Sequence, residues 1–126
     1  IWVKLMGNAP LNPVSAITGA TLDKIMSNSA TRRLVAGIMD EVQAVAYAVG
    51  VKPGVTTEQR MAAAARVGPH KTSMLQDLEA GRPPETEPIM GAVLEVAAKV
   101  NVPAPRLQAV YACTKLLFEQ QLADRM

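Results

Sequence analysis

The chain has 126 residues, of which 49% are hydrophobic and only 3% aromatic, and its formal net charge at pH 7 is +2. This length fits one domain that buries roughly two thirds of its unfolded surface around a single core. The small, evenly spread charge argues against a nucleic-acid partner, and no apolar run approaches the roughly 20 residues of a membrane span. The one cysteine, Cys113, excludes an internal disulfide, so we expect a reducing, cytoplasmic location.

The composition predicts a helical protein. Ala, Val, Leu and Met dominate, and no segment alternates with period two for long enough to form a strand. We therefore expect a compact all-α domain of about six to eight helices. The chain opens with Ile1 inside a helical pattern and holds no glycine-rich phosphate-binding loop. We interpret residues 1–126 as one domain of a longer protein, with any nucleotide-binding domain upstream.

Two prolines divide the first predicted helical region. Residues 1–9 predict a short apolar helix that Pro10 limits, because proline lacks the N–H that continues a helix. Asn12 and Pro13 then predict a second helix, with the amide at the N-cap and proline at the first helical position. A further short helix is predicted at residues 21–27.

The longest predicted helix runs from about Ala30 to Val49 and ends at Gly50. Apolar residues recur in it at three- and four-residue spacing, which indicates a face turned toward a core. These residues are Leu34, Ile38, Met39, Val42, Val45, Ala46 and Val49.

Caps and breakers divide the rest of the chain into shorter helices. Thr56 and Gln59 form a capping box at the start of an alanine-rich segment. Glycine and proline interrupt the pattern at 68–71, and a proline-rich linker follows at 101–105. The predicted helices span about 56–67, 73–80, 87–100 and 105–123.

A polar stripe crosses the first apolar segment. Lys4, Asn8 and Asn12 stand four residues apart, so along a helix each drifts only ~40° from the last and the three span ~12 Å of axis. An unpaired ammonium on such a wall is costly, which favours a small polar ligand as its partner. Two alternatives remain open: Lys4 as an ordinary surface lysine, and Asn12 as an N-cap before Pro13.

A second polar group follows some seventy residues later. Ser73 and Asp77 lie four apart on one predicted helical face, and Glu85 follows a proline turn. Short helices held between breakers often present functional groups from a rigid base. Each residue also has a structural alternative: Ser73 with Gln76 fits a capping box, Asp77 fits a solvated charge, and Glu85 fits a carboxylate in the first turn of the next helix.

Taken together, these motifs resemble the C-terminal domain of ketopantoate reductase (2-dehydropantoate 2-reductase). The resemblance implies an all-helical domain of the 6-phosphogluconate dehydrogenase C-terminal-like type, an NADP cofactor bound mainly by an N-terminal Rossmann domain, and a small 2-oxo acid substrate of pantothenate biosynthesis. It covers essentially the whole chain and rests on these segments: Lys4-x3-Asn8-x3-Asn12-Pro13, Ile38-Met39-Asp40-Glu41-Val42, Gly50, Thr72-Ser73-Met74-Leu75-Gln76-Asp77, Glu85 and Gly91.

The resemblance also implies residue roles. Lys4 corresponds to the general acid of the family, and its ammonium suits the alkoxide that hydride transfer leaves on a ketone oxygen. Asn8, Asn12 and Ser73 correspond to residues that bind the substrate. Amides bond hydroxyl or carboxylate groups without adding charge, and a serine at a helix start can hold a carboxylate.

The remaining correspondences concern the edge of the site. Asp77 matches an acidic residue that supports the site, and Glu85 matches one that reaches the cofactor or the substrate hydroxyl at the cleft. Leu22 stands where other members carry a further substrate-contacting Asn, which leaves open a related reductase acting on a different 2-oxo or 2-hydroxy acid.

Other residues have structural interpretations. His70 is the only histidine and has no second ligand at a suitable spacing, so we expect no metal site. Cys113 falls on an apolar stripe with Val110 and Leu117 and is expected in the core. The rival to an enzyme is a helical dimerisation or interaction module, and a homodimer fits either interpretation.

Overall fold

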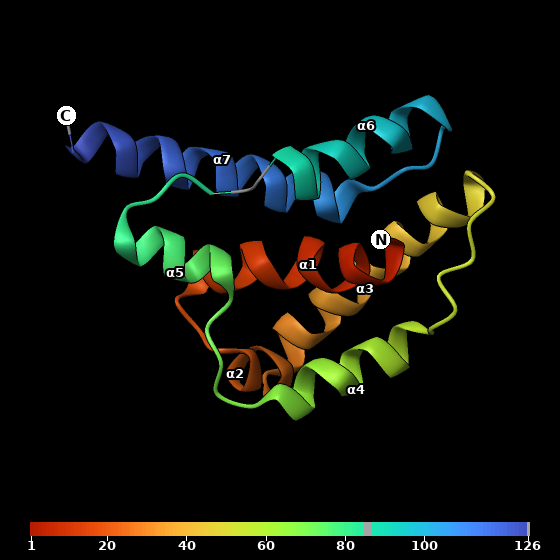
Figure 1. Ribbon diagram of the computed structural model, residues 1–126, viewed down its shortest axis with the longest axis horizontal. Helices are drawn as coiled ribbons and strands as arrows, with labels where there is room; N and C mark the ends of the chain where they lie inside the picture. The colour runs from red at the N-terminus through yellow and green to blue at the C-terminus, as the bar shows by residue number, and fades with distance from the viewer. Residues whose placement is uncertain (85–86, 126) are drawn as a thin grey trace.

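The computed structural model describes residues 1–84 and 87–125, and over these ranges it contains seven α-helices and one π-helical turn (Figure 1). The prediction of an all-α domain with six to eight helices is confirmed. The elements are α1 (Trp2–Thr18), α2 (Leu22–Ser27), α3 (Ser29–Ala48), α4 (Thr57–Val67), α5 (Ser73–Ala80), η1 (Glu87–Gly91), α6 (Ala92–Lys99) and α7 (Pro105–Arg125).

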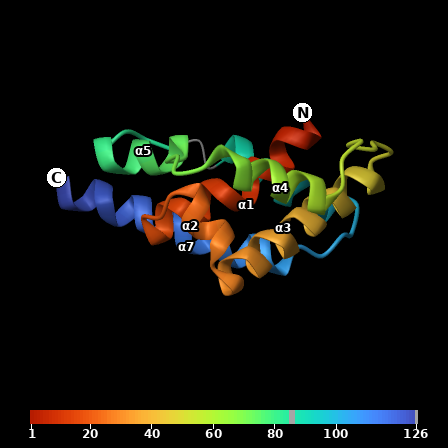
Figure 2. The ribbon, with the colours of Figure 1, turned by 90° about the horizontal axis from the view of Figure 1, so that it is seen from below.

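Helix α1 is the centre of the arrangement, since it contacts α3, α5, α7 and α4. Figure 1 shows α6 and α7 on one side of α1, with α2 and α4 on the other. In the view turned by 90°, α4 and α5 lie together on one face and α3 and α7 on the opposite one (Figure 2). The face that carries α4 and α5 is the one that presents the polar residues of α1.

Two groups of apolar side chains fill the interior. The larger one joins α1, α3, α5, α6 and α7, and the smaller one joins α1, α2, α3 and α4. The side chains buried most completely are Met6, Ile25, Ile38, Met39, Met74, Leu75, Met90, Leu107, Val35, Val42, Val45 and Val93. No helix among the described residues has the length and apolar character needed to cross a membrane.

Helix α1 is continuous through Pro10 and Pro13, so the prediction of two helices in this region is wrong. A proline inside a helix removes one hydrogen bond and costs about 3 kcal/mol in isolation. Here every residue from 9 to 16 is buried against other helices, and this packing outweighs the local preference. Continuity matters for the site, because it keeps the four-residue stripe of α1 on one face.

Local signals located most other boundaries correctly. The capping box of Thr56 and Gln59 is present, with both reciprocal hydrogen bonds. The predicted stripe of α3 is buried from Ile38 to Ala46, but Val49 at its end is exposed.

The prediction that Cys113 lies in the core is wrong, since its side chain is exposed. The buried face of α7 is formed by Leu107, Val110 and Thr114. Position 113 falls about 100° before Thr114 around the helix, beyond the edge of that face.

Helix α7 is attached to α3 through a buried carboxylate. Glu41, which is 7% exposed, accepts hydrogen bonds from the backbone N–H groups of Leu107 at 2.9 Å and Arg106 at 3.1 Å. The first N–H groups of a helix have no partner within it, so this side chain of another helix acts as their cap. Glu41 thereby fixes where α7 begins relative to the rest of the domain.

Candidate functional site

Three elements meet around a small hollow that opens on the face shared by α1, α4 and α5. Its volume is about 200 Å³, which is smaller than the roughly 300–1,000 Å³ of typical ligand pockets, so only a small molecule fits it. Its polar part comes from α1 and the start of α5, and its apolar part from α2 and α4. The lining residues are Asn8, Leu11, Asn12, Leu22, Arg60, Ala64, Val67, Thr72 and Ser73.

The unbroken course of α1 places Asn8 and Asn12 on one face of the helix, as their spacing predicted, and this face forms part of the wall of the hollow. Asn12 is only 6% exposed and Asn8 is half-buried. Within the described part of the chain, neither side-chain amide has a hydrogen-bond partner. Since Asn12 lies inside the helix, its interpretation as an N-cap is wrong. Two amides at a hollow without protein partners are available to a ligand.

A buried pair of hydroxyl groups brings Ser73 to the same hollow. Ser15 of α1, which is fully buried, donates to the backbone C=O of Asn12 at 2.8 Å and is also bonded to the hydroxyl of Thr72. The single proton of Ser15 goes to Asn12, so Thr72 is the donor in the hydroxyl pair. This pair fixes the start of α5 against α1, and Ser73 follows directly.

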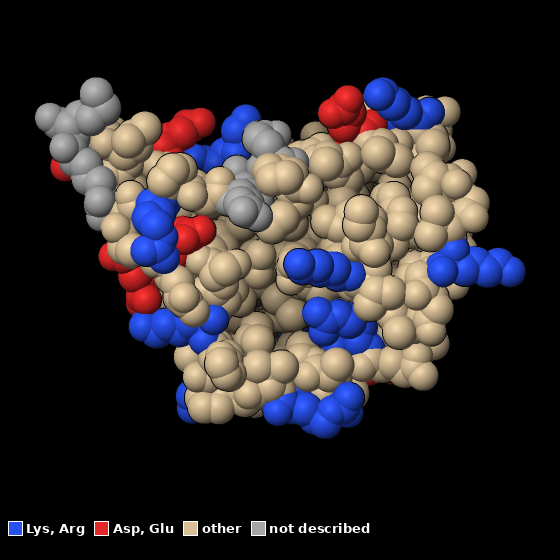
Figure 3. All heavy atoms as spheres, viewed as in Figure 1, with Lys and Arg blue, Asp and Glu red and all other residues tan. Residues whose placement is uncertain are grey.

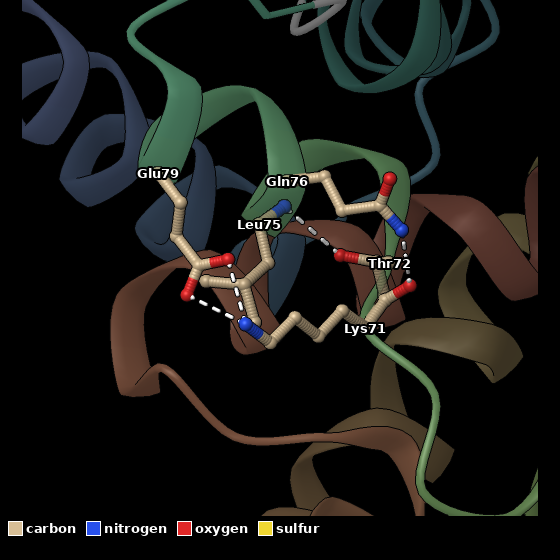
Figure 4. A network of polar contacts seen from close by, with 5 residues as sticks. All are labelled: Lys71, Thr72, Leu75, Gln76 and Glu79. Atoms are coloured by element: carbon tan, nitrogen blue, oxygen red, sulfur yellow. Dashed lines mark hydrogen bonds and ion pairs between the residues drawn. The ribbon is translucent and has the colours of Figure 1, made fainter.

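Helix α5 is capped by Thr72, so the capping role considered for Ser73 is wrong. The hydroxyl of Thr72 accepts from the backbone N–H of Leu75 at 3.1 Å (Figure 4). In the same network Gln76 donates to the C=O of Lys71 at 3.2 Å, and Lys71 pairs with Glu79 at 2.9 Å. The preceding residue does the capping, which leaves the Ser73 hydroxyl for the hollow.

Lys4 lies beside this hollow rather than within it. It lines a second depression on the same face, between the start of α1 and helix α4, and its side chain is exposed. Arg60 lines both depressions and is therefore the residue at which they meet. Figure 3 shows basic side chains next to one another on this face, over α1 and α4 and mainly among uncharged atoms. Lys4, Asn8, Asn12 and Ser73 thus share one face.

Arg60 is the residue of this face that the sequence did not single out. Its guanidinium lies over Gly7 of α1: a Cβ added at Gly7 would stand 1.9 Å from Nη2 and 2.4 Å from Cζ of Arg60. The close approach therefore depends on a glycine within a helix, where glycine is otherwise unfavourable. A glycine one residue before Asn8 was the only hint in the sequence, and it named no partner.

Leu22 supplies part of the apolar side of the hollow. The backbone N–H of Leu22 donates to the C=O of His70 at 2.9 Å, and that of Asp23 donates to Gly68 at 3.1 Å. These bonds join the start of α2 to the loop between α4 and α5. The hydroxyl of Thr21 donates to the carboxylate of Asp23 and lowers the pKa of that carboxyl group, but Asp23 does not line the hollow.

The two acidic site residues expected from the sequence lie further along the chain. Asp77, one turn after Ser73, forms an ion pair with Arg82 at 3.0 Å and does not line the hollow. Its carboxylate therefore holds the end of α5 to the segment that follows. Glu85 lies outside the described residues. No group of three or more His, Cys, Asp or Glu side chains among the described residues is arranged to hold a metal ion.

Comparison with known proteins relates this arrangement to one family. Residues 1–118 match the family model described as the C terminal of ketopantoate reductase PanE/ApbA. The chain is 45% identical over 117 residues to a 2-dehydropantoate 2-reductase of Mesorhizobium japonicum, covering 93% of this chain and 36% of that protein. A 2-dehydropantoate 2-reductase of Nostoc sp. is 34% identical over 117 residues, which is 92% of this chain and 37% of that protein.

Solved structures show the same relationship in three dimensions. The crystal structure of 2-dehydropantoate 2-reductase from Methylococcus capsulatus superimposes with a TM-score of 0.89 at 38% identity, over 95% of this chain and 39% of that one. The enzyme from Geobacter metallireducens gives a TM-score of 0.84 at 31% identity, over 94% and 39%. The chain thus spans little more than a third of the length of these relatives.

Proposed function

Since the chain belongs to the ketopantoate reductase family and matches its C-terminal domain, we propose that it forms the substrate-binding part of an NADP-dependent 2-oxo acid reductase. The names of its relatives make ketopantoate, reduced to pantoate, the first substrate to test. The observation that carries the proposal is the meeting of Asn8, Asn12 and Ser73 at one hollow, with Lys4 beside it on the same face.

The chemistry assigns a separate task to Lys4. An NADP cofactor would be held mainly by an N-terminal Rossmann domain and would supply the hydride that reduces the carbonyl carbon. The carbonyl oxygen must then take up a proton. The ammonium of Lys4 donates that proton from Nζ and stabilises the negative charge that develops on the oxygen. Its exposure in this chain suits the role, because a proton donor on the open face beside the hollow can meet a substrate that the other domain covers.

The other proposed site residues bind and orient. The amides of Asn8 and Asn12 and the hydroxyl of Ser73 bind the polar groups of the substrate, because they line the hollow and the protein leaves them unpartnered or exposed. Asp77 supports the site by holding Arg82, and with it the start of the segment that leads to Glu85. Glu85 is proposed to reach the cofactor.

The test uses the full-length protein with NADPH and ketopantoate. Lys4→Ala should lower kcat by on the order of 100-fold or more, the usual contribution of a general acid. Lys52→Ala, at an exposed lysine in the loop before α4, is the matched control and should leave kcat unchanged. A kcat of Lys4→Ala within twofold of the wild-type value would contradict the assignment of Lys4 as proton donor. A wild-type protein that reduces no 2-oxo acid would remove the function, in favour of a dimerisation module without catalysis.

Leu22 favours a second candidate substrate within the same activity. An apolar side chain lines the hollow there and offers no hydrogen bond to a substrate hydroxyl. A 2-oxo acid with an apolar side chain would suit this wall better than one bearing a hydroxyl. Comparing kcat/KM for ketopantoate with that for 2-oxo acids that lack its hydroxyl decides between the two.

A homodimer is proposed as the assembly. A solved relative, 25% identical and with a TM-score of 0.80, is described as the dimeric ketopantoate reductase of Staphylococcus aureus. Several large apolar side chains of this chain are exposed, among them Leu116 and Leu122 of α7. Sedimentation equilibrium of the full-length protein measures the assembly directly, and a monomer at micromolar concentration would contradict the proposal.

A further inference from the structure

Arg60 occupies the position from which a cation can act on both depressions of the candidate site. Among the described residues it is the only charged one that lines the hollow with Asn8, Asn12 and Ser73, and it also lines the depression that contains Lys4. Its side chain is half-buried, and Gly7 leaves the space in which its guanidinium lies. A cation is thereby held at the rim of a hollow whose other described lining groups are all neutral.

The guanidinium of Arg60 has no protein partner within the described ranges. Other arginines there do have partners: Arg82 pairs with Asp77 and Arg106 with Glu41. Arg33 and Arg66 are also unpaired among the described residues, but their side chains are exposed to water, whereas Arg60 is half-buried. A half-buried guanidinium gives up part of its hydration, and an anion is the natural compensation.

We propose that Arg60 binds the carboxylate of the 2-oxo acid and so determines the preference of the site for acids; the inference rests on the function proposed above. Every substrate of this class carries a carboxylate next to the reacting carbonyl. Arginine matches a carboxylate with two parallel N–H donors in one plane, which also fixes the orientation of the substrate. The amides and the Ser73 hydroxyl then bind its remaining oxygens.

The two cations have different tasks because their chemistry differs. Arginine stays protonated at all working pH values and cannot supply the proton that the reaction requires, whereas lysine can. Lys4 is therefore assigned to the carbonyl oxygen and Arg60 to the carboxylate. Their positions at adjoining depressions are consistent with binding neighbouring groups of one small molecule.

The experiment compares a 2-oxo acid with its uncharged methyl ester in the full-length protein. The 2-oxo acid with the highest wild-type kcat/KM is used. Arg60→Gln should lower kcat/KM for the acid by on the order of 100-fold, mainly through KM, while changing that for the ester by less than threefold. Arg60→Lys should restore part of the loss, because it returns the charge without the planar fork. Activity toward the ester shows that each variant is folded.

A second variant moves the guanidinium without removing it. Gly7→Ala places a Cβ where Arg60 now lies and should also lower the preference for the acid. Gly37→Ala is the matched control, because its Cβ meets the side chain of Arg106 instead and should leave the preference unchanged. An acid-to-ester ratio unchanged in Arg60→Gln, or a loss that falls on the KM for NADPH, would overturn the inference alone. A wild-type protein inactive on both compounds would overturn the proposed function as well.

Discussion

Gly7 and Arg60 occupy one space between α1 and α4, because the guanidinium lies where a side chain at Gly7 would begin. Gly7→Ala has two opposing effects on stability. Alanine favours the helix by about 0.5–1 kcal/mol over glycine. The displaced group is the far end of a flexible side chain, which can turn into solvent at low cost. We therefore expect Gly7→Ala to leave the free energy of unfolding unchanged or raised by up to about 1 kcal/mol, measured by urea denaturation.

Gly37→Ala provides the contrast for that measurement. Its Cβ would stand 2.6 Å from Cδ of Arg106, whose side chain is paired with Glu41. Displacing Arg106 disturbs this pair, so Gly37→Ala should be less stable than Gly7→Ala. If Gly7→Ala instead lost more than about 2 kcal/mol, the guanidinium of Arg60 would be a fixed part of the packing.

Asn12 and Asn28 are proposed to have different roles: the amide of Asn12 binds a ligand, and that of Asn28 caps a helix. Asn28 accepts hydrogen bonds from the N–H groups of Ala30 and Thr31 at the start of α3, whereas Asn12 lies inside α1. Asn28→Ala should cost about 1 kcal/mol of stability. Asn12→Ala should cost less than about 0.5 kcal/mol, because alanine favours a helix interior, yet raise the KM for the 2-oxo acid at least tenfold. A large stability loss with unchanged KM would make Asn12 a structural residue.

The sequence was sufficient to predict those features of the fold that depend on residues close to one another in the chain. The capping box at Thr56 and Gln59 and the periodic apolar face of α3 are local signals; the capping box is confirmed, and the apolar face is confirmed from Ile38 to Ala46. The prediction of two helices on either side of Pro10 was wrong, because burial against other helices keeps α1 continuous and burial is not a local property of the sequence. The prediction for Cys113 failed for a related reason, since an apolar stripe on a helix does not reveal how wide its buried face is.

The candidate site likewise has features that the sequence could predict and features that it could not. The spacing of Lys4, Asn8 and Asn12 correctly placed them on one face of a helix, because that relationship is contained within α1. The role of Thr72 as cap and as partner of Ser15 was not predicted, since either hydroxyl at the start of α5 could have capped it. The position of Arg60 depends on the packing of α4 against α1, for which one sequence holds no direct signal.

The hydroxyl pair of Ser15 and Thr72 should couple α1 to α5 energetically. Ser15→Ala leaves the buried Thr72 hydroxyl without its acceptor, and Thr72→Val removes both the pair and the cap of α5. In a double-mutant cycle the two changes should therefore be less than additive, with a coupling free energy of about 1 kcal/mol. If the two free-energy changes instead added to within about 0.3 kcal/mol, the usual error of such cycles, the hydroxyl pair would not couple α1 to α5.

Glu41 offers the clearest test of how α7 is held. Its carboxylate accepts from the N–H groups of Arg106 and Leu107 while largely excluded from water. Glu41→Gln keeps the shape but removes the charge that favours a helix start, and its amide can turn a donor toward those N–H groups. We expect a loss of about 2 kcal/mol in the free energy of unfolding. Glu95→Gln, in the exposed pair with Lys99, is the control and should cost under about 0.5 kcal/mol. Equal effects of the two substitutions would show that α7 is held by its apolar face alone.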